Sequence, residues 1–310
     1  MRNRVINELK QMALEDQNIY LICADLGYSV LDSFKEAFPK RFINVGISEQ
    51  NMASVAAGLA LEGNMVFVYS IGNFPTLRCI EQIRNDICYH NANVKILSVG
   101  GGFAYGDLGM THHATEDIAM MRALPNMRVY VPADPKEAAL CLRDAIRYDS
   151  PAFIRMSKGG ERELYSQDNF EDFCHLKGLT KSHNDVVSIV ACGPILESAI
   201  ELKQIFDREG VCSGVYSAPL VKPICAEDVV RIAKQSKMII TMEEHNVIGG
   251  LGGAVSEVVA SLSGERACVY RVGLDDKYTE IVGNQKFLRD YYGMTAEKVY
   301  RRIRNAGVLD

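Results

Sequence analysis

The sequence Asn44-Val45-Gly46-Ile47-Ser48-Glu49-Gln50-Asn51 runs directly into a predicted helix, and it decides how the first half of the chain is interpreted. Apolar residues follow it at helical spacing, at Met52, Val55, Ala56, Leu59 and Ala60. Ser48 stands at the position of a helix cap, so Glu49 falls in the first turn, beside backbone N–H groups that have no helical partner. A carboxylate there complements the helix dipole by about 0.3–1 kcal/mol, so its position alone indicates no function.

Outside this helix, short apolar runs alternate with amphipathic segments along the whole chain. In the first half the predicted strands are Ile19–Ala24, Met65–Ser70, Val94–Val99, Arg128–Val131 and Ala152–Met156. The helical segments between them are Glu49–Glu62, Ile80–His90 and Pro135–Tyr148. The second half has predicted strands at Val186–Cys192, Val211–Tyr216, Met238–Glu243 and Ala267–Val272, and a predicted helix at Ser198–Glu209. Strands of near-continuous hydrophobicity are typical of sheets covered on both faces, so the sequence predicts an α/β protein with two doubly wound domains and mainly parallel sheets.

The alternation breaks once, between Gly159 and Asp185, where charged and polar residues show no periodicity. We expect a linker there. The predicted division is a first domain over residues 1–165, a linker over 166–184 and a second, smaller domain over 185–310.

Composition narrows the classes of partner. The 310 residues carry a formal net charge of -5 and no block of Lys or Arg, so we expect neither a nucleic acid nor an anionic membrane surface as partner. The nine cysteines are scattered without a C-x-x-C pair, which is typical of reduced thiols. No signal-like or membrane-spanning apolar stretch is present in the sequence, and we therefore expect a cytoplasmic protein.

Polar and aromatic residues gather where predicted strands end. Asp25 follows the first strand, Phe74 ends the run Val68-Tyr69-Ser70-Ile71-Gly72-Asn73-Phe74, and a glycine-rich loop leads from Gly100 to His112-His113. Each has an ordinary explanation: an Asp before Gly is commonly a turn residue, a lone Phe is usually core, and two adjacent histidines are weak evidence for a metal. We therefore predict no metal site within the chain. The glycine-rich loop also lacks the spacing of a nucleotide-binding motif.

The helix-entry sequence, G-I-S-E-Q-N-x-x-x-x-A-A-G-L-A, resembles the glutamate segment of transketolases and of 1-deoxyxylulose-5-phosphate synthases. The resemblance implies a pyrimidine-binding domain followed by a transketolase C-terminal-like domain, with thiamine diphosphate as cofactor. It also implies that Glu49 hydrogen-bonds a ring nitrogen of the aminopyrimidine. That contact favours the imino tautomer, which can take the proton from the thiazolium carbon, so Glu49 is expected to be catalytic.

The same resemblance assigns further site residues. Phe74 is expected to stack on the cofactor, while Ile71 stands where transketolases tend to carry a second aromatic residue. Asp25 lies in an A-D-L segment and is expected on the thiazolium side. The segment G-x-T-H, followed by Glu116-Asp117, resembles the loop in which a transketolase histidine faces the reacting carbonyl, so His112 is expected to polarise that oxygen or move its proton.

Three departures from the family pattern concern the substrate. Leu108 stands where transketolases commonly carry an Asp that reads a sugar hydroxyl, and Gly100 falls where they carry a phosphate-binding His. Lys158 replaces an arginine that binds the sugar phosphate, which exchanges a planar fork for a point charge. A hydroxyl facing Leu would stay unpaired at a cost of about 1–3 kcal/mol. We therefore expect an acceptor other than an ordinary sugar phosphate, such as a nucleotide-linked or otherwise modified sugar.

One part of a thiamine-diphosphate site is missing from the sequence. Gly106-Asp107-Leu108 is present, but no G-D-G motif for the diphosphate and Mg²⁺. Since Mg²⁺ requires a nearly octahedral shell of oxygens, we expect another polypeptide to supply this site. By family analogy the partner is an N-terminal transketolase subunit, and the assembly is an α2β2 heterotetramer.

The expected activity is transfer of a two-carbon ketol unit from a ketose donor to an aldehyde or ketone acceptor. Three alternatives stay open: the beta subunit of a 2-oxo-acid dehydrogenase, a 1-deoxyxylulose-5-phosphate synthase-like enzyme, and a non-catalytic binding module. The A-D-L and T-H-H segments favour transketolase over the dehydrogenase, and the presence of Glu49 argues against the module. The segment Glu243–Gly253 predicts close packing of a helix on a strand, with anion binding at the helix start as the other possibility.

Overall fold

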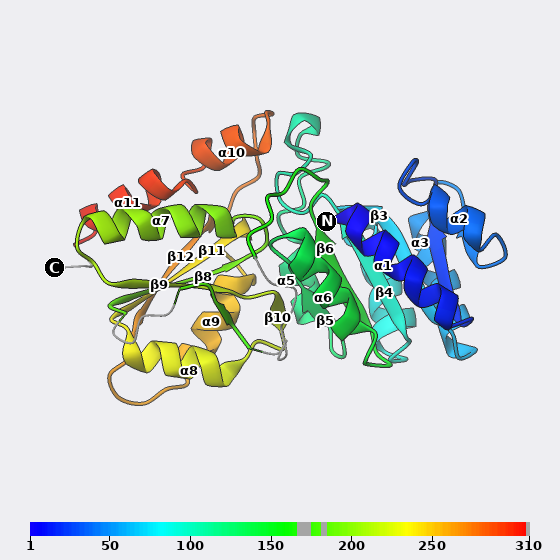
Figure 1. The fold of residues 1–310 in the computed structure, drawn as a ribbon, viewed down its shortest axis with the longest axis horizontal. Helices are drawn as coiled ribbons and strands as arrows, with labels where there is room; N and C mark the ends of the chain where they lie inside the picture. Colours follow the sequence, from blue (N-terminus) through cyan, green and yellow to red (C-terminus); the bar gives the residue numbers. More distant parts are fainter. Residues whose placement is uncertain (166–174, 181–184, 308–310) are drawn as a thin grey trace.

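The molecule contains two sheets of mainly parallel strands (Figure 1). The structure is a computed structural model that describes residues 1–165, 175–180 and 185–307. The first sheet has seven strands in the order β10-β5-β6-β4-β3-β1-β2. In chain order these strands are β1 (Ile19–Cys23), β2 (Phe42–Asn44), β3 (Met65–Ile71), β4 (Val94–Val99), β5 (Arg128–Tyr130), β6 (Ala152–Met156) and β10 (Leu220–Lys222). All neighbours are parallel except β10, which pairs antiparallel with β5.

Helices cover both faces of this sheet. One face carries α1 (Arg2–Glu15), α2 (Asp32–Ala37) and α6 (Pro135–Ala145). The other carries α3 (Glu49–Leu61), α5 (Asp117–Ala123) and a run of short turns, namely η1 (Leu77–Cys79), α4 (Ile80–Gln82) and η2 (Ile83–Cys88), a π-helix.

The second sheet has five strands in the order β12-β11-β8-β9-β7. They are β7 (Lys177–Gly178), β8 (Val187–Cys192), β9 (Ser213–Ser217), β11 (Met238–Asn246) and β12 (Cys268–Leu274). Only β7 is antiparallel to its neighbour. One face packs against α7 (Leu196–Arg208), α10 (Gln285–Tyr291) and α11 (Ala296–Asn305), and the other against α8 (Ala226–Gln235) and α9 (Leu251–Ala260) (Figure 1).

The two halves of the chain share the first sheet and one cluster of buried apolar side chains. Strand β10 belongs to the second half of the sequence but pairs with β5 of the first sheet, Leu220 opposite Tyr130. One cluster of buried apolar side chains runs from α3 and α5 across to α8 and α9. Elements at the ends of the two sheets are therefore held in fixed positions relative to one another.

The predicted fold class is confirmed, and the predicted strands agree with the structure to within three residues at either end. The predicted helix over Ile80–His90 is wrong in detail, since a single α-turn gives way to the π-helix η2. Ser48 does occupy the N-cap of α3, but its hydroxyl donates to the Val45 carbonyl, 2.9 Å away, and caps no helical N–H.

Part of the predicted linker, residues 166–174 and 181–184, lies outside the described residues. Within the remaining part, Lys177–Gly178 already pairs with the second sheet as β7. The exact division into domains stays a prediction. Among the helices of the described ranges, none is both long and apolar enough to cross a bilayer.

Candidate functional site

Glu49 is a buried carboxylate at the first residue of α3. The loop that delivers it follows β2 and turns at Gly46, whose φ of +73° favours glycine. Only 3% of the Glu49 side chain is exposed, and its Oε2 accepts a hydrogen bond of 2.8 Å from Nη1 of Arg78. A nearly buried acid is thus kept paired at the carboxyl end of the first sheet.

Arg78 links Glu49 to the predicted aromatic residue. Its guanidinium carbon lies 4.4 Å from the centroid of the Phe74 ring. The same planar group therefore stacks on Phe74 and donates an N–H to Glu49. Since 45% of the Arg78 side chain is exposed, it can be displaced without disturbing the core. The position that this guanidinium occupies, in contact with both Glu49 and Phe74, is called the slot below.

The two adjacent histidines have different environments. The ring of His112 lies edge-on to Phe74, with 5.3 Å between centroids, and its Nδ1 lies 3.1 Å from the Thr111 hydroxyl. Among the described residues its Nε2 has no hydrogen-bond partner. His113 is buried, with Nδ1 at 2.6 Å from the Thr279 hydroxyl and Nε2 at 3.0 Å from the Gly106 carbonyl. His112 is therefore available for chemistry, whereas His113 holds the loop in place.

Tyr105 extends this line of side chains and was not predicted. Its ring lies 6.5 Å from that of His112, and the Lys158 ammonium is 5.4 Å from its centroid. Gly100 is buried beneath it, and a Cβ at position 100 would overlap the Tyr105 ring. The Tyr105 ring therefore takes the space that a side chain at position 100 would need. Burial raises the pKa of the Tyr105 phenol, so it stays a neutral hydroxyl.

The other predicted residues are not joined to this line by a described side-chain contact. Asp25 has a left-handed backbone, φ +54°, and its carboxylate accepts from the Asn44 amide at 3.2 Å and from the Tyr28 hydroxyl at 3.0 Å. It thereby ties the loop after β1 to the loop that leads to Glu49. Ile71 ends β3 half-buried, and Leu108 lies 55% exposed on the short 3-10 turn η3 (Gly106–Leu108).

The loop that carries His112 is anchored to the second half of the chain. Buried Glu244, at the end of β11, accepts from the Phe103 amide at 2.5 Å, from the Gln285 side chain at 2.8 Å and from Arg289. Buried Arg155 donates to Asp117 at 2.8 Å and to the Glu244 carbonyl at 3.0 Å. These side chains hold the loop in position through contacts with the second half of the chain. No local sequence pattern predicted that Glu244 or Arg155 would have this role.

The segment Glu243–Gly253 agrees with close packing. The Glu243 carboxylate accepts from the backbone N–H groups of Leu251 at 2.7 Å and Gly252 at 2.8 Å, at the start of α9. A carboxylate of the chain itself therefore occupies the position at which an external anion would bind.

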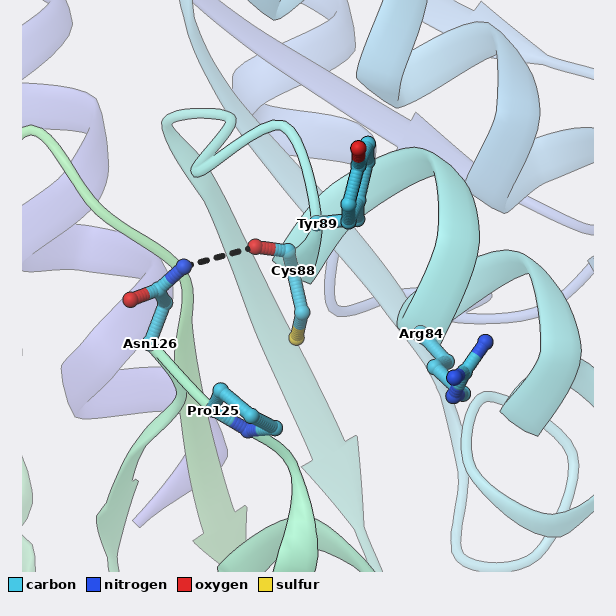
Figure 2. Close-up of a pocket in the computed structure, with 5 residues that line it drawn as sticks. All are labelled: Arg84, Cys88, Tyr89, Pro125 and Asn126. Carbon is cyan, nitrogen blue, oxygen red and sulfur yellow. Dashed lines mark hydrogen bonds between the residues drawn. The ribbon is translucent and has the colours of Figure 1, made fainter.

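A surface pocket of about 150 Å³ lies elsewhere, between η2 and the turn before β5 (Figure 2). Its lining residues are Arg84, Cys88, Tyr89, Pro125 and Asn126. Burial raises the pKa of Cys88 to about 12, so this thiol stays protonated. The pocket has apolar walls but no group prepared for catalysis.

A buried glutamate at a helix start, an aromatic ring and a loop histidine, all at one end of a parallel sheet, agree with the resemblance to the pyrimidine-binding class of thiamine-diphosphate domains. Comparison with known families agrees. The family described as the transketolase pyrimidine binding domain matches residues 1–162, and the transketolase C-terminal domain matches residues 176–299. The chain belongs to the transketolase family of thiamine-diphosphate-dependent transferases.

Similar proteins of comparable length come from several organisms. A putative transketolase C-terminal section of Methanocaldococcus jannaschii is 35% identical over 98% of this chain and 95% of its own length. A subunit of the apulose-4-phosphate transketolase of Phocaeicola vulgatus is 32% identical, with 96% and 94% covered. A subunit of the 6-deoxy-6-sulfo-D-fructose transketolase of a Clostridium species is 31% identical, with 97% and 92% covered.

Solved structures share the fold. A split-gene transketolase, solved as an inactive β4 tetramer, superposes with a TM-score of 0.89 at 36% identity, covering 99% of this chain and 98% of that one. The transketolase of Campylobacter jejuni has a TM-score of 0.80 at 18% identity, over 98% of this chain and 46% of that one. The second likeness concerns the fold alone.

Proposed function

We propose that this chain is the pyrimidine-binding subunit of a two-chain transketolase, which transfers a two-carbon ketol unit from a ketose donor to an aldehyde or ketone acceptor. The stacking of Arg78 on Phe74, with its hydrogen bond to Glu49, is the observation that carries the proposal. A planar group with an outward N–H already fits this slot. The residues present are therefore suited to the aminopyrimidine of thiamine diphosphate.

The proposal assigns a role to each predicted site residue. Glu49 holds the ring nitrogen and Phe74 supports the ring face, while Asp25, in the loop after β1, and Ile71, at the end of β3, are proposed as further cofactor contacts. The bound cofactor supplies the carbon nucleophile that ketol transfer requires. His112 presents Nε2 to the substrate carbonyl, where it donates or accepts a proton as charge develops on oxygen.

The diphosphate and Mg²⁺ are expected on an N-terminal subunit, in an α2β2 heterotetramer. Large apolar side chains flank the site residues in sequence and are exposed: Ile47 at 80%, Leu77 at 54% and Met110 at 50%. A docked polypeptide would cover them and close the site against water. Two of the relatives are themselves named as single subunits of a transketolase, and this chain spans more than 90% of each, which supports a second chain.

The acceptor is expected to differ from an ordinary sugar phosphate, for instance a nucleotide-linked or otherwise modified sugar. Leu108 offers no hydrogen bond to a sugar hydroxyl, and Lys158 offers only a point charge. The Tyr105 ring lies over Gly100, where related enzymes are expected to carry a phosphate-binding histidine. Two relatives are named for uncommon sugars, 6-deoxy-6-sulfo-D-fructose and apulose 4-phosphate, of which only the second carries a phosphate.

The test is reconstitution. The chain is purified with its N-terminal subunit, thiamine diphosphate and Mg²⁺ are added, and donor ketose cleavage is measured. Glu49→Gln should lower the rate by about 10²–10⁴-fold, while Glu36→Gln on the exposed side of α2 serves as the matched control. Wild-type complex that binds no cofactor and cleaves no ketose would contradict the proposal.

Two other outcomes bear on the substrate. A clear preference for ribose 5-phosphate as acceptor would contradict the proposed unusual sugar. Formation of 1-deoxyxylulose 5-phosphate would favour the synthase alternative. That alternative is tested because a 1-deoxy-D-xylulose-5-phosphate synthase from Heliobacterium modesticaldum is 32% identical to this chain, which covers 46% of the synthase's length.

A further inference from the structure

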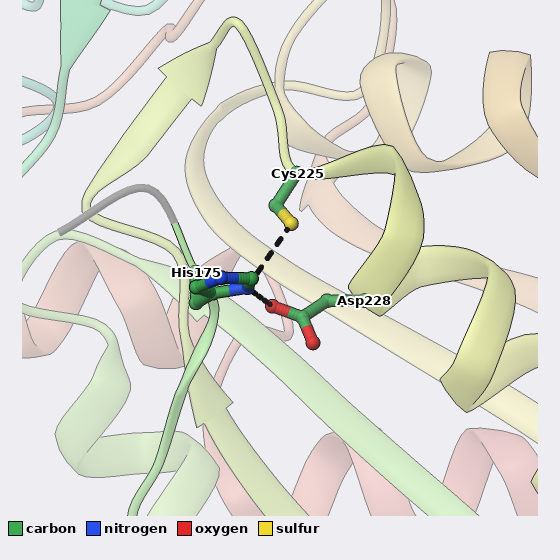
Figure 3. Close-up of side chains that lie close together, drawn as sticks. All are labelled: His175, Cys225 and Asp228. Atoms are coloured by element: carbon green, nitrogen blue, oxygen red, sulfur yellow. Dashed lines mark hydrogen bonds and ion pairs between the residues drawn. The ribbon is translucent and has the colours of Figure 1, made fainter. Parts of the chain in front are cut away.

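Three side chains of different chemistry converge at the start of α8, in the second half of the chain (Figure 3). Cys225 is the N-cap residue of α8, Asp228 lies in its first turn, and His175 comes from the segment that precedes β7. Nδ1 of His175 lies 2.9 Å from Oδ2 of Asp228 and 3.4 Å from Sγ of Cys225. The three ligand atoms all lie within 4.8 Å of one another.

We propose that His175, Cys225 and Asp228 bind one divalent transition metal ion of the zinc type, at a site separate from the catalytic residues. Ligand atoms about 2.0–2.3 Å from a tetrahedral ion are roughly 3.3–3.7 Å apart. The His175–Cys225 separation already has this value, and the His175–Asp228 separation has to open by a few tenths of an ångström. A solvent molecule can take the fourth position, because 39% of the His175 side chain is exposed.

The ligand set selects the kind of ion. A thiolate, an imidazole and a carboxylate together suit zinc or cobalt, whereas magnesium and calcium prefer oxygen ligands alone. Burial raises the pKa of the Cys225 thiol, so a metal has to displace its proton and should bind more tightly as the pH rises.

The carboxylate is oriented by its neighbours. Arg231 donates to Oδ1 of Asp228 at 2.7 Å, and the backbone N–H of Leu176 donates to Oδ2 at 2.9 Å. Partial burial opposes the effect, but the hydrogen bonds from Arg231, Leu176 and His175 lower the pKa of Asp228 and keep it ionised. Such contacts hold a ligating carboxylate in position.

A Cys–His–Asp relay for nucleophilic catalysis does not fit this geometry. A relay uses one ring nitrogen for the thiol and the other for the carboxylate. Here Nδ1 of His175 faces both Cys225 and Asp228. Metal binding agrees with the position of Cys225 and Asp228 around the same nitrogen of His175. A bound ion would connect the segment before β7 to the start of α8.

The first test uses the wild-type chain after metal removal. Zn²⁺ should slow alkylation of Cys225 by iodoacetamide, followed by peptide mass spectrometry, and leave the exposed thiols of Cys212 and Cys268 unaffected. At a hundredfold excess over its Kd, Zn²⁺ should raise Tm by about 5 °C. Equal alkylation of Cys225 with and without Zn²⁺ would overturn the proposal.

The second test uses Co²⁺ as a coloured probe. One equivalent should give a sulfur-to-cobalt charge-transfer band that Zn²⁺ removes, that Cys225→Ser and His175→Ala abolish, and that Cys268→Ser retains. Absence of the band in the wild-type chain, or its loss in Cys268→Ser, would contradict the site. Because the alkylation test needs no variant, a misfolded Cys225→Ser does not prevent a decision.

Discussion

At the scale of single residues, His112 and His113 show how neighbours in sequence acquire different functions. The His112 ring lies edge-on to Phe74, while the buried His113 bridges Thr279 and Gly106. The contacts therefore give His113 a structural role and leave His112 as the histidine for which we propose a catalytic role.

Substitution of each histidine should separate the two roles. His112→Gln should lower ketol transfer in the reconstituted enzyme by about 10²–10⁴-fold with an unchanged Tm, because it removes proton transfer and no buried contact. His113→Gln should cost about 1–3 kcal/mol of unfolding free energy, because buried partners lose their hydrogen bonds. Urea unfolding and initial rates check both. Equal losses of stability in the two variants would contradict the assignment.

Arg78 should compete with the cofactor for Glu49. Arg78→Ala removes a half-exposed ion pair, which contributes about 0–1 kcal/mol, so the affinity of the reconstituted enzyme for thiamine diphosphate should rise by up to about fivefold. Arg78→Lys keeps the charge but not the planar stack, and is the matched control. The measurement is cofactor titration monitored by activity and by fluorescence. Weaker binding in Arg78→Ala would instead make Arg78 a cofactor contact.

At the scale of elements, strand bounds were predicted correctly where every residue of the strand is buried. Every residue of β4, Val94–Val99, is buried, and the prediction gave the same bounds. Strand β10 was not predicted because its three residues form a strand only by pairing with β5, far away in sequence. The π-helix η2 likewise depends on tertiary packing and not on local periodicity.

The candidate site depends on the same distinction between local and distant contacts. Glu49, Phe74 and His112 lie in segments that resemble a known family, so each could be predicted from its own neighbourhood, and their roles stay predictions. Arg78 follows Phe74 by four residues, across the turn that leads into η1, and this spacing indicated no role by itself. Tyr105 and Glu244 act through contacts that only the folded chain creates.

Strand β4 carries a buried lysine whose charge should make stability depend on pH. Desolvation lowers the pKa of Lys95 to about 7, and its amine donates to the carbonyls of Tyr148 at 2.8 Å and Ser150 at 2.6 Å. Between about pH 7 and 10.5 the unfolded chain binds the proton that the folded chain lacks. Stability should therefore rise with pH through this window, by several kcal/mol at most.

The check is urea unfolding from pH 7 to 10 for the wild type and Lys95→Met. Buried thiols titrate in the same range with the opposite sign, so the informative quantity is the difference between the two proteins. We expect the stability advantage of Lys95→Met to be largest near pH 7 and to shrink as the pH rises. A difference that stays constant over the range would mean that Lys95 remains charged in the folded protein.

At the scale of the whole molecule, the second half of the chain supports a site whose predicted catalytic residues all lie in the first half. Glu244 and Arg155 join β11 to the loop that carries His112, and His113 reaches Thr279 across the same boundary. The packed core between α5 and α9 makes this joint rigid. The second half of the chain therefore holds the loop of His112 in position, and we expect it to affect the proposed chemistry in this way.

Glu244→Gln tests this coupling. The change removes the acceptor of Arg289, whose side chain is 12% exposed, so a buried guanidinium loses its partner at a cost of about 3–5 kcal/mol. We expect faster hydrogen exchange in residues 100–113 and slower ketol transfer, although Glu244 does not touch the slot. Glu257→Gln is the control, because its 67% exposed carboxylate pairs with Arg122 and should contribute at most about 1 kcal/mol. Equal stability of the two variants and equal hydrogen-exchange rates in residues 100–113 would contradict this coupling. The contacts between the second half and the loop would then contribute to packing but not to the position of the loop.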